Sequence, residues 1–355
     1  SLSSDVCASC HGEPLRHARF QQWEDSSHSD YTLATGRGTS PSCGRCHSAQ
    51  GYLAWLPQLE AGNPGSIEAE ITWTAETAEP VTCATCHDPH DVGLTSGDPN
   101  TTKVRIDGDT PMLPAGFKAV GVGRGALCMT CHNTRNGAHN DVVTEVMNDR
   151  APHVAAQADV LMGQNAYFVN VGARASHSFI EDTCTTCHME LTPPPKALSY
   201  NLSGTNHTFE ASAGICSQCH GEYDGGTLAG AIETMMHDLE LAIEGAIEAE
   251  IVAQLDAGRT LVLKGMASDE SDVLVTPGTV INEVVLTEYH GRIAMNLSID
   301  GVLYEHIRME SDTELLAGTE TMSLLASDAG QIIAKAAWNY FLVHGDGSHG
   351  IHNPS

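Results

Sequence analysis

The sequence predicts two unlike regions: a mostly irregular region with few short helices over residues 1–220, and a small α+β module over residues 221–355. Three observations support this division. All 12 cysteines lie in the first region, which is rich in Gly, Pro, Thr and Asp and has few long periodic runs. The second region has no cysteine and carries helical and alternating apolar patterns. The length of 355 residues fits about two domains.

The composition indicates which partners the protein can have and what fills its core. Seventeen Lys and Arg against 45 Asp and Glu give a net charge of −28. We therefore expect no nucleic-acid partner, because phosphate backbones attract Lys and Arg. We also expect no transmembrane segment, because no stretch approaches the roughly 18 apolar residues that a membrane helix needs. Aromatic residues make up only 5% of the chain, which indicates that something other than protein fills part of the interior.

The cysteines form six C-x-x-C pairs, and a histidine directly follows each pair. The pairs are Cys7/Cys10, Cys43/Cys46, Cys83/Cys86, Cys128/Cys131, Cys184/Cys187 and Cys216/Cys219, followed by His11, His47, His87, His132, His188 and His220. C-x-x-C-H is the attachment signature of c-type haem. The two thiols form thioethers with the porphyrin, and the histidine ligates the iron from the proximal side. We therefore expect six covalently bound haem c groups.

Two other interpretations of the cysteines deserve comparison. Six C-x-x-C pairs could form three zinc ribbons with four cysteines each, or disulfides in a secreted chain. Neither arrangement requires a histidine after the second cysteine. Histidine is only 19 of 355 residues, so six occurrences in six pairs favour haem. No cysteine then remains for a disulfide or a nucleophile.

The two regions also differ in the elements they predict. In the first region, helices are expected over Leu15–Asp25, Asp141–Met147 and Ala155–Leu161. In the second region, Ala229–Leu255 has one apolar stripe and ends before Gly258, which predicts a long helix. The remaining expected elements are strands over Thr260–Lys264, Asp272–Val275, Val280–Thr287, Arg292–Ile299 and Val302–Met309, a turn at Asp300-Gly301, and a helix over roughly Thr321–Val343.

Several segments resemble the multihaem c-type cytochromes related to cytochrome c nitrite reductase and its non-catalytic relatives. The segments are Cys83–His90 (CATCHDPH), His17–His28 (HARFQQWEDSSH), Ala151–Asp159 (APHVAAQAD), Ser176-His177, Asn206-His207-Thr208 and the terminal Asp346–Pro354 (DGSHGIHNP). The resemblance covers most of the chain. It implies a mostly irregular, α-containing multihaem cytochrome c region in residues 1–220, with most irons ligated by two histidines.

The resemblance points to seven histidines as distal iron ligands, one more than six haems need. They are His17, His28, His90, His153, His177, His207 and His352. One of His17, His28 and His352 should be left over, and His139 is a reserve. His237 is expected to pack against the apolar stripe of its helix. His290, His306 and His344 are expected to be structural or solvent-facing.

Electron transfer, with no catalytic residue, is the expected function. The nitrite-reducing relatives attach a catalytic haem through C-x-x-C-K, and no such motif occurs here. The expected partners are redox proteins or extracellular electron acceptors. One form of the protein would be a homopolymer, an extracellular filament with stacked haems in which His17, His28 or His352 ligates a haem of the next copy. The alternatives are a periplasmic electron shuttle and a nitrite or hydroxylamine reductase with one open haem.

The type of haem attachment also predicts where the protein acts. In bacteria and archaea, covalent attachment of this kind takes place on the outer side of the cytoplasmic membrane. We therefore expect an extracellular or periplasmic protein. Since the sequence starts without a charged and apolar leader, a signal peptide is expected to have been removed.

Overall fold

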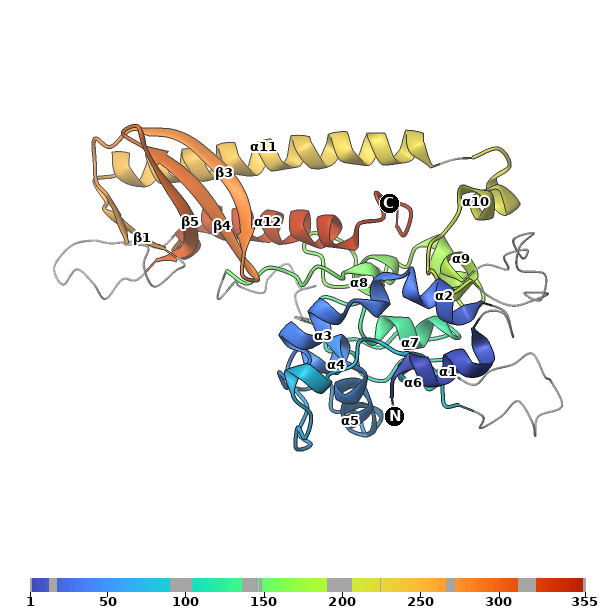
Figure 1. Cartoon of the computed structure of the whole chain (residues 1–355). Helices are drawn as coiled ribbons and strands as arrows, with labels where there is room; N and C mark the ends of the chain where they lie inside the picture. Colours follow the sequence, from blue (N-terminus) through green and yellow to red (C-terminus); the bar gives the residue numbers. More distant parts are fainter. Residues whose placement is uncertain are drawn as a thin grey trace. The chain divides into compact units, whose positions relative to one another are not determined.

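The computed structural model describes residues 2–12, 18–89, 104–135, 146, 149–189, 206–223, 225–265, 272–311 and 324–353. The chain divides into two compact units (Figure 1). Unit 1 comprises Ser1–Asn133 and Ala175–Gly225, and unit 2 comprises Thr134–Arg174 and Gly226–Ser355. The change of unit at Gly225 lies close to the boundary expected at residue 220. The segment Thr134–Arg174, in contrast, belongs with the C-terminal module rather than with the cysteine-rich region.

Long-range hydrogen bonds explain why Thr134–Arg174 belongs to unit 2. The indole Nε1 of Trp338 donates to the carbonyl oxygen of Asn165 at 2.6 Å. The side chain of Asn339 bonds both the backbone nitrogen and the carbonyl oxygen of Tyr167, each at 2.8 Å. Tyr167 and Ala151 are also buried in the hydrophobic core of unit 2. No local sequence pattern reports such contacts, because they join residues far apart in the chain.

Unit 1 is built from short helices joined by irregular segments. Its α-helices are α1 Ser4–His11, α2 Arg19–Glu24, α3 Tyr31–Arg37, α4 Gly44–His47, α5 Ala49–Glu60, α6 Cys83–Cys86, α7 Gly125–Met129, α9 Cys184–His188 and α10 Ala213–His220. Its 3₁₀ turns are η1 Ser27–Ser29, η2 Ala75–Thr77 and η3 Ser176–Phe179. The helix expected over Leu15–Asp25 corresponds to α2. The helix expected over Asp141–Met147 lies almost entirely outside the described residues.

Unit 2 contains two long helices and one antiparallel sheet. Its elements are α8 Gln157–Leu161, α11 Gly226–Asp256, β1 Leu261–Gly265, β2 Val273–Val275, β3 Ile281–Tyr289, β4 Arg292–Ile299, β5 Val302–Ser311, η5 Leu324–Ala326 and α12 Asp328–Asp346. The strand order is β2-β1-β5-β4-β3. The predicted strands and both predicted long helices are confirmed, with ends shifted by a few residues. Burial alternates along much of β3 and β4, which is the pattern that predicted these strands.

Two tight turns fix the register of the last three strands. Asp300 and Gly301 both have positive φ, 49° and 79°, as a two-residue turn with the right-handed strand twist requires. This turn between β4 and β5 was predicted. His290 and Gly291 form the turn between β3 and β4 with φ of 51° and 78°. That turn has histidine where Asn or Asp is usual, so the sequence pattern did not indicate it.

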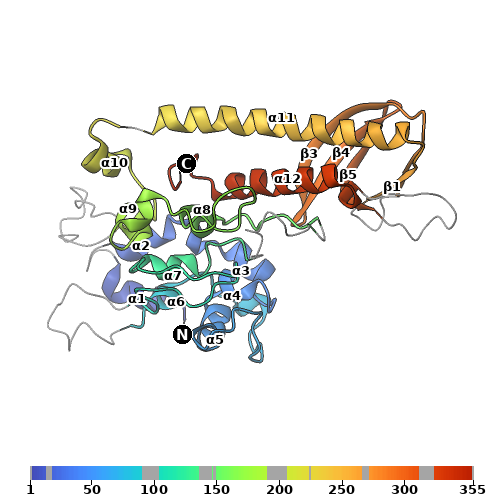
Figure 2. The same cartoon turned by 180° about the vertical axis from the view of Figure 1, so that it is seen from behind.

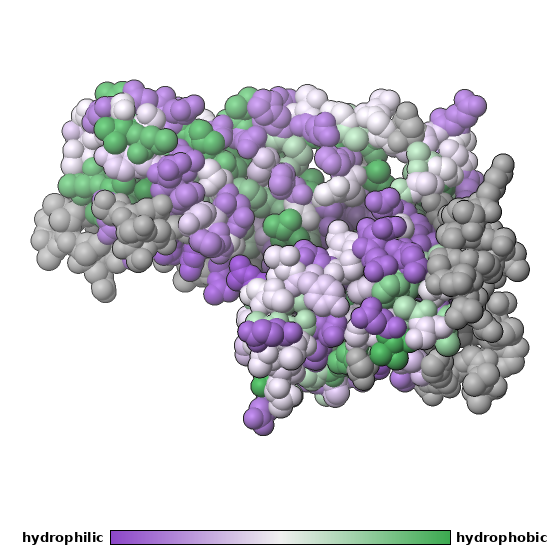
Figure 3. Space-filling view, in the orientation of Figure 1, coloured by the Kyte–Doolittle hydropathy of each residue, from purple (hydrophilic) through white to green (hydrophobic). Residues whose placement is uncertain are grey.

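The sheet covers the C-terminal half of α11, through β3 and β1, and α11 and α12 run side by side (Figures 1 and 2). Buried side chains of α12 belong to the same core. Ile243, Ile247 and Ile251 of α11 are buried in this core. Met235, in the N-terminal half of the same stripe, is 57% exposed. Apolar side chains are also exposed on the sheet, where a hydrophobic patch is visible (Figure 3). The exposed apolar residues of the sheet and its turns are Leu274, Val280, Val285, Val302 and Leu303.

Both edges of the sheet are protected. β2 is only three residues long. At the other edge, the backbone N–H of Leu286 in β3 donates to the carboxylate of Glu244 in α11 at 2.8 Å. Short or covered edges prevent unwanted strand pairing. Among the described residues, no helix is both long enough and apolar enough to cross a membrane.

Candidate haem-attachment sites

Each of the six C-x-x-C-H motifs forms or borders a short helix in unit 1. The motif segments are α1, α4, α6, α7, α9 and α10. Residues three apart on a helix lie on the same face. The two thiols of each motif are therefore presented from one turn, with the histidine beside them, as haem attachment requires.

Glycine permits close approach of the fourth and fifth motifs. A Cβ added to Gly125, the first residue of α7, would lie 1.8 Å from the hydroxyl oxygen of Thr183. Thr183 precedes Cys184 and donates its hydroxyl to the carbonyl of Val122 at 2.9 Å. The backbone of Arg124 is held in the same way by the carboxylate of Asp182, at 2.8 Å. The two attachment segments are thus fixed against each other.

Thiols from different motifs also contact one another. Hydrogen bonds join Cys7 to Cys83, Cys46 to Cys131 and Cys128 to Cys184. Burial, followed by the Cys83 thiol, raises the pKa of Cys7 to about 11. Burial also raises the pKa of Cys86 to about 12, while the hydrogen bond from Cys46 lowers the pKa of Cys131. The first and third, second and fourth, and fourth and fifth attachment segments are therefore neighbours.

The second cysteines of the first and sixth motifs have more open surroundings than the other ten. Cys10 and Cys219 are exposed, whereas the remaining cysteines, Cys187 included, are partly buried. Helices α1 and α10 present these two thiols to the surface. Haem attachment at all twelve cysteines stays a prediction that depends on the C-x-x-C-H motif.

Three proximal histidines each lie opposite one of the predicted distal histidines. The ring centroids are 6.1 Å apart for His132 and His28, 6.2 Å for His87 and His207, and 6.0 Å for His220 and His177. The planes of these pairs meet at 89°, 32° and 83°, respectively. Each pair thus combines a histidine of one motif with a histidine from a distant segment.

These separations fit two imidazoles that share one iron. A bond from a metal to an imidazole nitrogen is about 2.0 Å, and the ring centre lies about 1.2 Å behind that nitrogen, so two rings on opposite sides of a metal are centred about 6.3 Å apart. Direct stacking is much closer, as the 3.8 Å between Tyr289 and His306 illustrates. The described residues therefore offer three ligand pairs of suitable spacing.

The surroundings of His28 keep it in the form that binds metals. Burial, with a smaller contribution from the His132 imidazole, lowers the pKa of His28 to about 4. The imidazole is therefore neutral at pH 7, and a neutral ring has a nitrogen lone pair for iron. His28 lies in η1, directly after α2, so the position of that helix decides where this ligand is held.

Helix α2 is tied to two haem-binding segments. The indole Nε1 of Trp23 donates to the carbonyl of Val81 at 2.8 Å, two residues before Cys83. The side-chain oxygen of Gln22 accepts the backbone N–H of His207 at 3.1 Å. The helix that precedes His28 thus also positions the third motif and the distal ligand opposite it.

The other predicted ligands lie in different parts of the chain. His17 and His90 are outside the described residues, as is His139. His11, His47 and His188 are in unit 1, and the Nδ1 of His188 bonds the carbonyl of Phe209 at 3.0 Å. His153 and His352 belong to unit 2. The structure therefore pairs three of the seven distal candidates with a proximal histidine.

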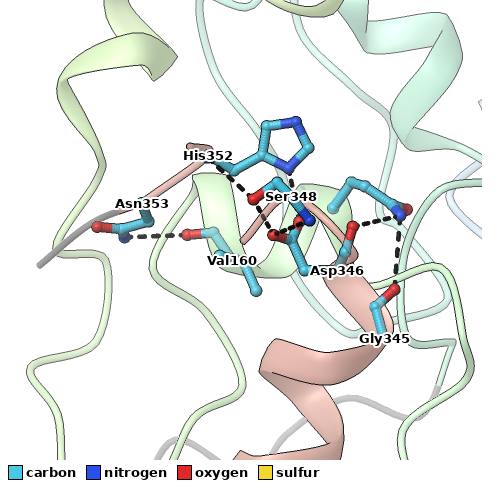
Figure 4. A network of polar contacts seen from close by, with 7 residues as sticks. Val160, Gly345, Asp346, Ser348, His352 and Asn353 are labelled. Carbon is cyan, nitrogen blue, oxygen red and sulfur yellow. Dashed lines mark hydrogen bonds and ion pairs between the residues drawn. The ribbon is translucent and has the colours of Figure 1, made fainter. Parts of the chain in front are cut away.

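His352 is the end of a polar network at the C-terminus of α12 (Figure 4). Its Nδ1 lies 2.6 Å from Asp346 Oδ1, while its other ring nitrogen points away from this carboxylate. Ser348 donates its hydroxyl to Asp346 and accepts the backbone N–H of His352 at 3.1 Å. Carboxylates commonly hold metal-ligating histidines in this way. The network therefore directs Nε2 of His352 away from Asp346, as ligation of a metal through that nitrogen would require.

One minor expectation was wrong. His237 does not pack against the apolar stripe of α11, since 66% of its side chain is exposed and it lies 3.7 Å from Glu240. It follows Met236 by one residue, so it is rotated by about 100° from the stripe. His306 stacks on Tyr289 and His344 on Tyr340, which agrees with structural roles for both.

The described residues do not favour the zinc or disulfide arrangements of the cysteines. All twelve cysteines are described, and none forms a disulfide. A structural zinc site needs four converging ligands. Within the described ranges, no group of three or more His, Cys, Asp or Glu side chains is arranged to hold a metal ion. The imidazole pairs, with two ligands each, match a porphyrin-bound iron better.

Comparisons with known proteins give no relative. No protein-family description matches the sequence, and neither the curated proteins nor the solved structures contain a match. The functional argument therefore depends on the residues and their geometry.

Proposed function

We propose that this protein transfers electrons through six covalently attached c-type haems, most of them with two histidine ligands. The observation that supports this most strongly is the set of three imidazole pairs at 6.0–6.2 Å. Each joins a C-x-x-C-H histidine to a histidine that was expected to be a distal ligand. Random surface histidines would not select partners in this way.

The chain would hold the haems while the haem irons supply the one-electron redox change. The twelve cysteines anchor the porphyrins, and the contacts between motifs keep neighbouring attachment segments together. Two imidazole ligands favour lower potentials than a His/Met pair. The net charge of −28 would favour basic redox partners in the periplasm or outside the cell.

Mass spectrometry and electron paramagnetic resonance (EPR) test this proposal. The mature chain should carry the mass of six haems, and its ferric spectrum should be low-spin. His207→Ala, His28→Ala and His177→Ala should each convert one haem of six to a high-spin form, because each removes one iron ligand. His237→Ala, at an exposed position, is the matched control. A chain that matures without haem would refute the proposal.

The same mass measurement tests attachment at the second cysteines of the first, fifth and sixth motifs. Peptides that contain Cys10, Cys187 or Cys219 should carry the haem mass, and Cys219→Ala should leave the sixth haem bound through Cys216 alone. A single thioether changes the visible absorption of the reduced haem, because one vinyl group then stays unsaturated. Free thiols at Cys10, Cys187 and Cys219 in the mature chain would mean that fewer haems, or fewer thioethers, are present than we propose.

The EPR spectrum also tests the reductase alternative. A reductase needs an iron with an open position for its substrate, and such a ferric iron gives a high-spin signal. We expect no high-spin signal in the unmodified protein. A signal corresponding to one haem would favour a reductase over a pure electron carrier.

A homopolymer is a second candidate, favoured by the number of candidate ligands. The sequence offers seven distal candidates for six irons. His352 is held by Asp346 with one nitrogen directed away from it, so it is suited to ligate a haem of another copy. Native material should then form filaments in negative-stain micrographs, and His352→Ala should leave single particles. Single particles of the unmodified protein at high concentration would favour the shuttle.

A further inference from the structure

Phe209 lies where histidines of three different motif sites meet. Its ring centroid is 4.4 Å from that of His28, in an edge-to-face arrangement at 89°. Its ring is also 6.0 Å from that of His207. Its carbonyl oxygen is 3.0 Å from Nδ1 of His188. His28, His207 and His188 belong to the sites of the fourth, third and fifth motifs.

The carbonyl contact fixes the hydrogen position on His188. A carbonyl oxygen can only accept, so Nδ1 of His188 must carry the hydrogen. Nε2 then has the lone pair that an iron requires. This contact orients the histidine of the fifth motif.

The backbone of Phe209 is held in an unusual conformation for this purpose. Its φ is 61°, in the left-handed region that non-glycine residues rarely adopt. The preceding turn is stiffened because Asn206 Oδ1 accepts the backbone N–H of Thr208 at 3.0 Å. The neighbouring His207 is anchored to Gln22 of α2. Strain of this kind costs about 1–3 kcal/mol and persists where the surroundings enforce it, often at functional sites.

The ring contact bears on the orientation of His28. The planes of His28 and His132 are perpendicular, at 89°, whereas those of His87 and His207 meet at 32°. The 4.4 Å contact between the rings of Phe209 and His28 limits how far the plane of His28 can turn.

We propose that Phe209 is a positioning residue that links the third, fourth and fifth haem sites: its ring sets the plane of His28, and its carbonyl sets the tautomer of His188. This inference rests on the proposed function, since it assumes irons between the imidazoles. It implies that these three haems are contiguous and respond together to a change at one residue.

The imidazole planes have a spectroscopic signature. Parallel ligand planes act on the same iron d orbital and separate it from its partner in energy, which gives an ordinary rhombic low-spin EPR signal. Perpendicular planes act on different d orbitals and leave them nearly equal, which gives a highly anisotropic signal. The fourth site, at 89°, and the sixth, at 83°, should be anisotropic, while the third, at 32°, should be rhombic.

The test compares Phe209→Gly and Phe209→Leu with the unmodified holoprotein. Glycine tolerates the positive φ and keeps the carbonyl, so it removes only the ring. We expect the anisotropic signal to lose the intensity of one haem and midpoint potentials of a subset of haems to shift. Leucine keeps bulk without a flat edge and should give a smaller change in the same direction. Phe168→Gly is the matched control, because Phe168 also has a positive φ, 64°, and is 52% exposed in unit 2.

The outcomes separate this inference from the proposed function. An unchanged spectrum and unchanged potentials in Phe209→Gly, with six haems bound, would overturn the role of the ring. If Phe209→Gly matures incompletely, Phe209→Leu decides in the same way. If the unmodified protein carries no low-spin haem, the proposed function itself fails. An equal change in Phe168→Gly would show that strain relief, and not the His28 contact, is responsible.

Discussion

The two units of this protein fill their interiors with different material. The hydrophobic core cluster of the described residues consists of unit 2 residues alone, with buried Ile, Leu, Val and Met side chains from the sheet and both long helices. Many of the buried residues of unit 1 are small, such as Ala34, Ala49 and Ala126. Unit 1 instead contains imidazole pairs about 6 Å apart. Unit 2 thus packs around one apolar protein core, whereas unit 1 buries small side chains together with a few large ones such as Trp55 and Tyr52. The proposed porphyrins would add apolar surface to unit 1.

Part of unit 1 is closely packed by its own backbone. A Cβ on Gly44 would lie 2.3 Å from the carbonyl oxygen of Gly38, and one on Gly51 would lie 2.2 Å from that of Gly44. Segments that approach so closely around α4 and α5 leave the motif helices densely arranged.

We expect the largest effect when haem is withheld, because unit 1 should then lose its folded structure. In the full chain produced without haem attachment, we expect amide hydrogen exchange across unit 1 to become fast, because its short helices are marginal alone. Unit 2 amides in α11, α12 and β3–β5 should stay protected, since their core needs no cofactor. Hydrogen exchange with mass spectrometry on both forms measures this. Equal protection of unit 1 with and without haem would remove the distinction between the units.

Truncation of a core side chain in unit 2 should destabilise unit 2 and leave unit 1 unchanged. Met295 in β4 is fully buried in unit 2, so Met295→Ala should lower the free energy of unfolding of unit 2 by about 2–5 kcal/mol through lost burial and a cavity. The haem content and EPR spectrum should not change. Met235→Ala, at a 57% exposed position of α11, is the control with little expected effect. Loss of haem signals in Met295→Ala would show that unit 1 depends on the core of unit 2.

The stability of unit 2 should also depend on pH through Asp159. Its carboxylate accepts hydrogen bonds from Thr134 N at 2.9 Å, Thr134 Oγ1 at 2.8 Å and Asn165 Nδ2 at 2.6 Å. Burial outweighs these bonds and raises the pKa of Asp159 to about 6. The folded state thus binds the proton more tightly than the unfolded state.

A raised carboxyl pKa favours the folded state at low pH. Protonated Asp159 contributes fully to the free energy of unfolding below the unfolded pKa near 4. As the pH rises to about 6 this contribution is lost, and the free energy of unfolding falls by at most about 3 kcal/mol. Asparagine cannot titrate, so the free energy of unfolding of Asp159→Asn should not fall in this way. Relative to the unmodified protein, the variant should therefore become more stable as the pH rises from 4 to 6. Denaturant unfolding of both proteins between pH 4 and 7 measures the difference, with the exposed Asp328→Asn as control. A difference that does not vary with pH would contradict the assigned environment of Asp159.

The sequence predicted the elements of unit 2 far better than the connections in unit 1. Alternating strands and the stripe of α11 are local patterns, so β1–β5, α11 and α12 were predicted almost completely. The six motifs were equally clear, because attachment chemistry requires a fixed spacing. Which distal histidine faces which motif depends on long-range folding: His28, before the second motif, faces the fourth. The same limitation hid Phe209 and Asp346, whose roles come from contacts rather than from local pattern.

The smallest expected effect concerns the bond that ties α2 to the third motif. Trp23→Phe keeps most of the buried ring but removes the donor to Val81, which should cost about 1 kcal/mol. Because α2 leads to His28 and Val81 leads to Cys83, the change should shift the potentials of the third and fourth haems together. Trp73→Phe removes a similar bond, from Nε1 to the carbonyl of Gly38 at 2.9 Å, which does not involve α2. A spectrally resolved redox titration distinguishes the two variants. Equal shifts of the potentials in both variants, or no shift in Trp23→Phe, would mean that α2 does not position the ligands. Shifts confined to Trp23→Phe would show that single hydrogen bonds to the backbone set the haem geometry of unit 1.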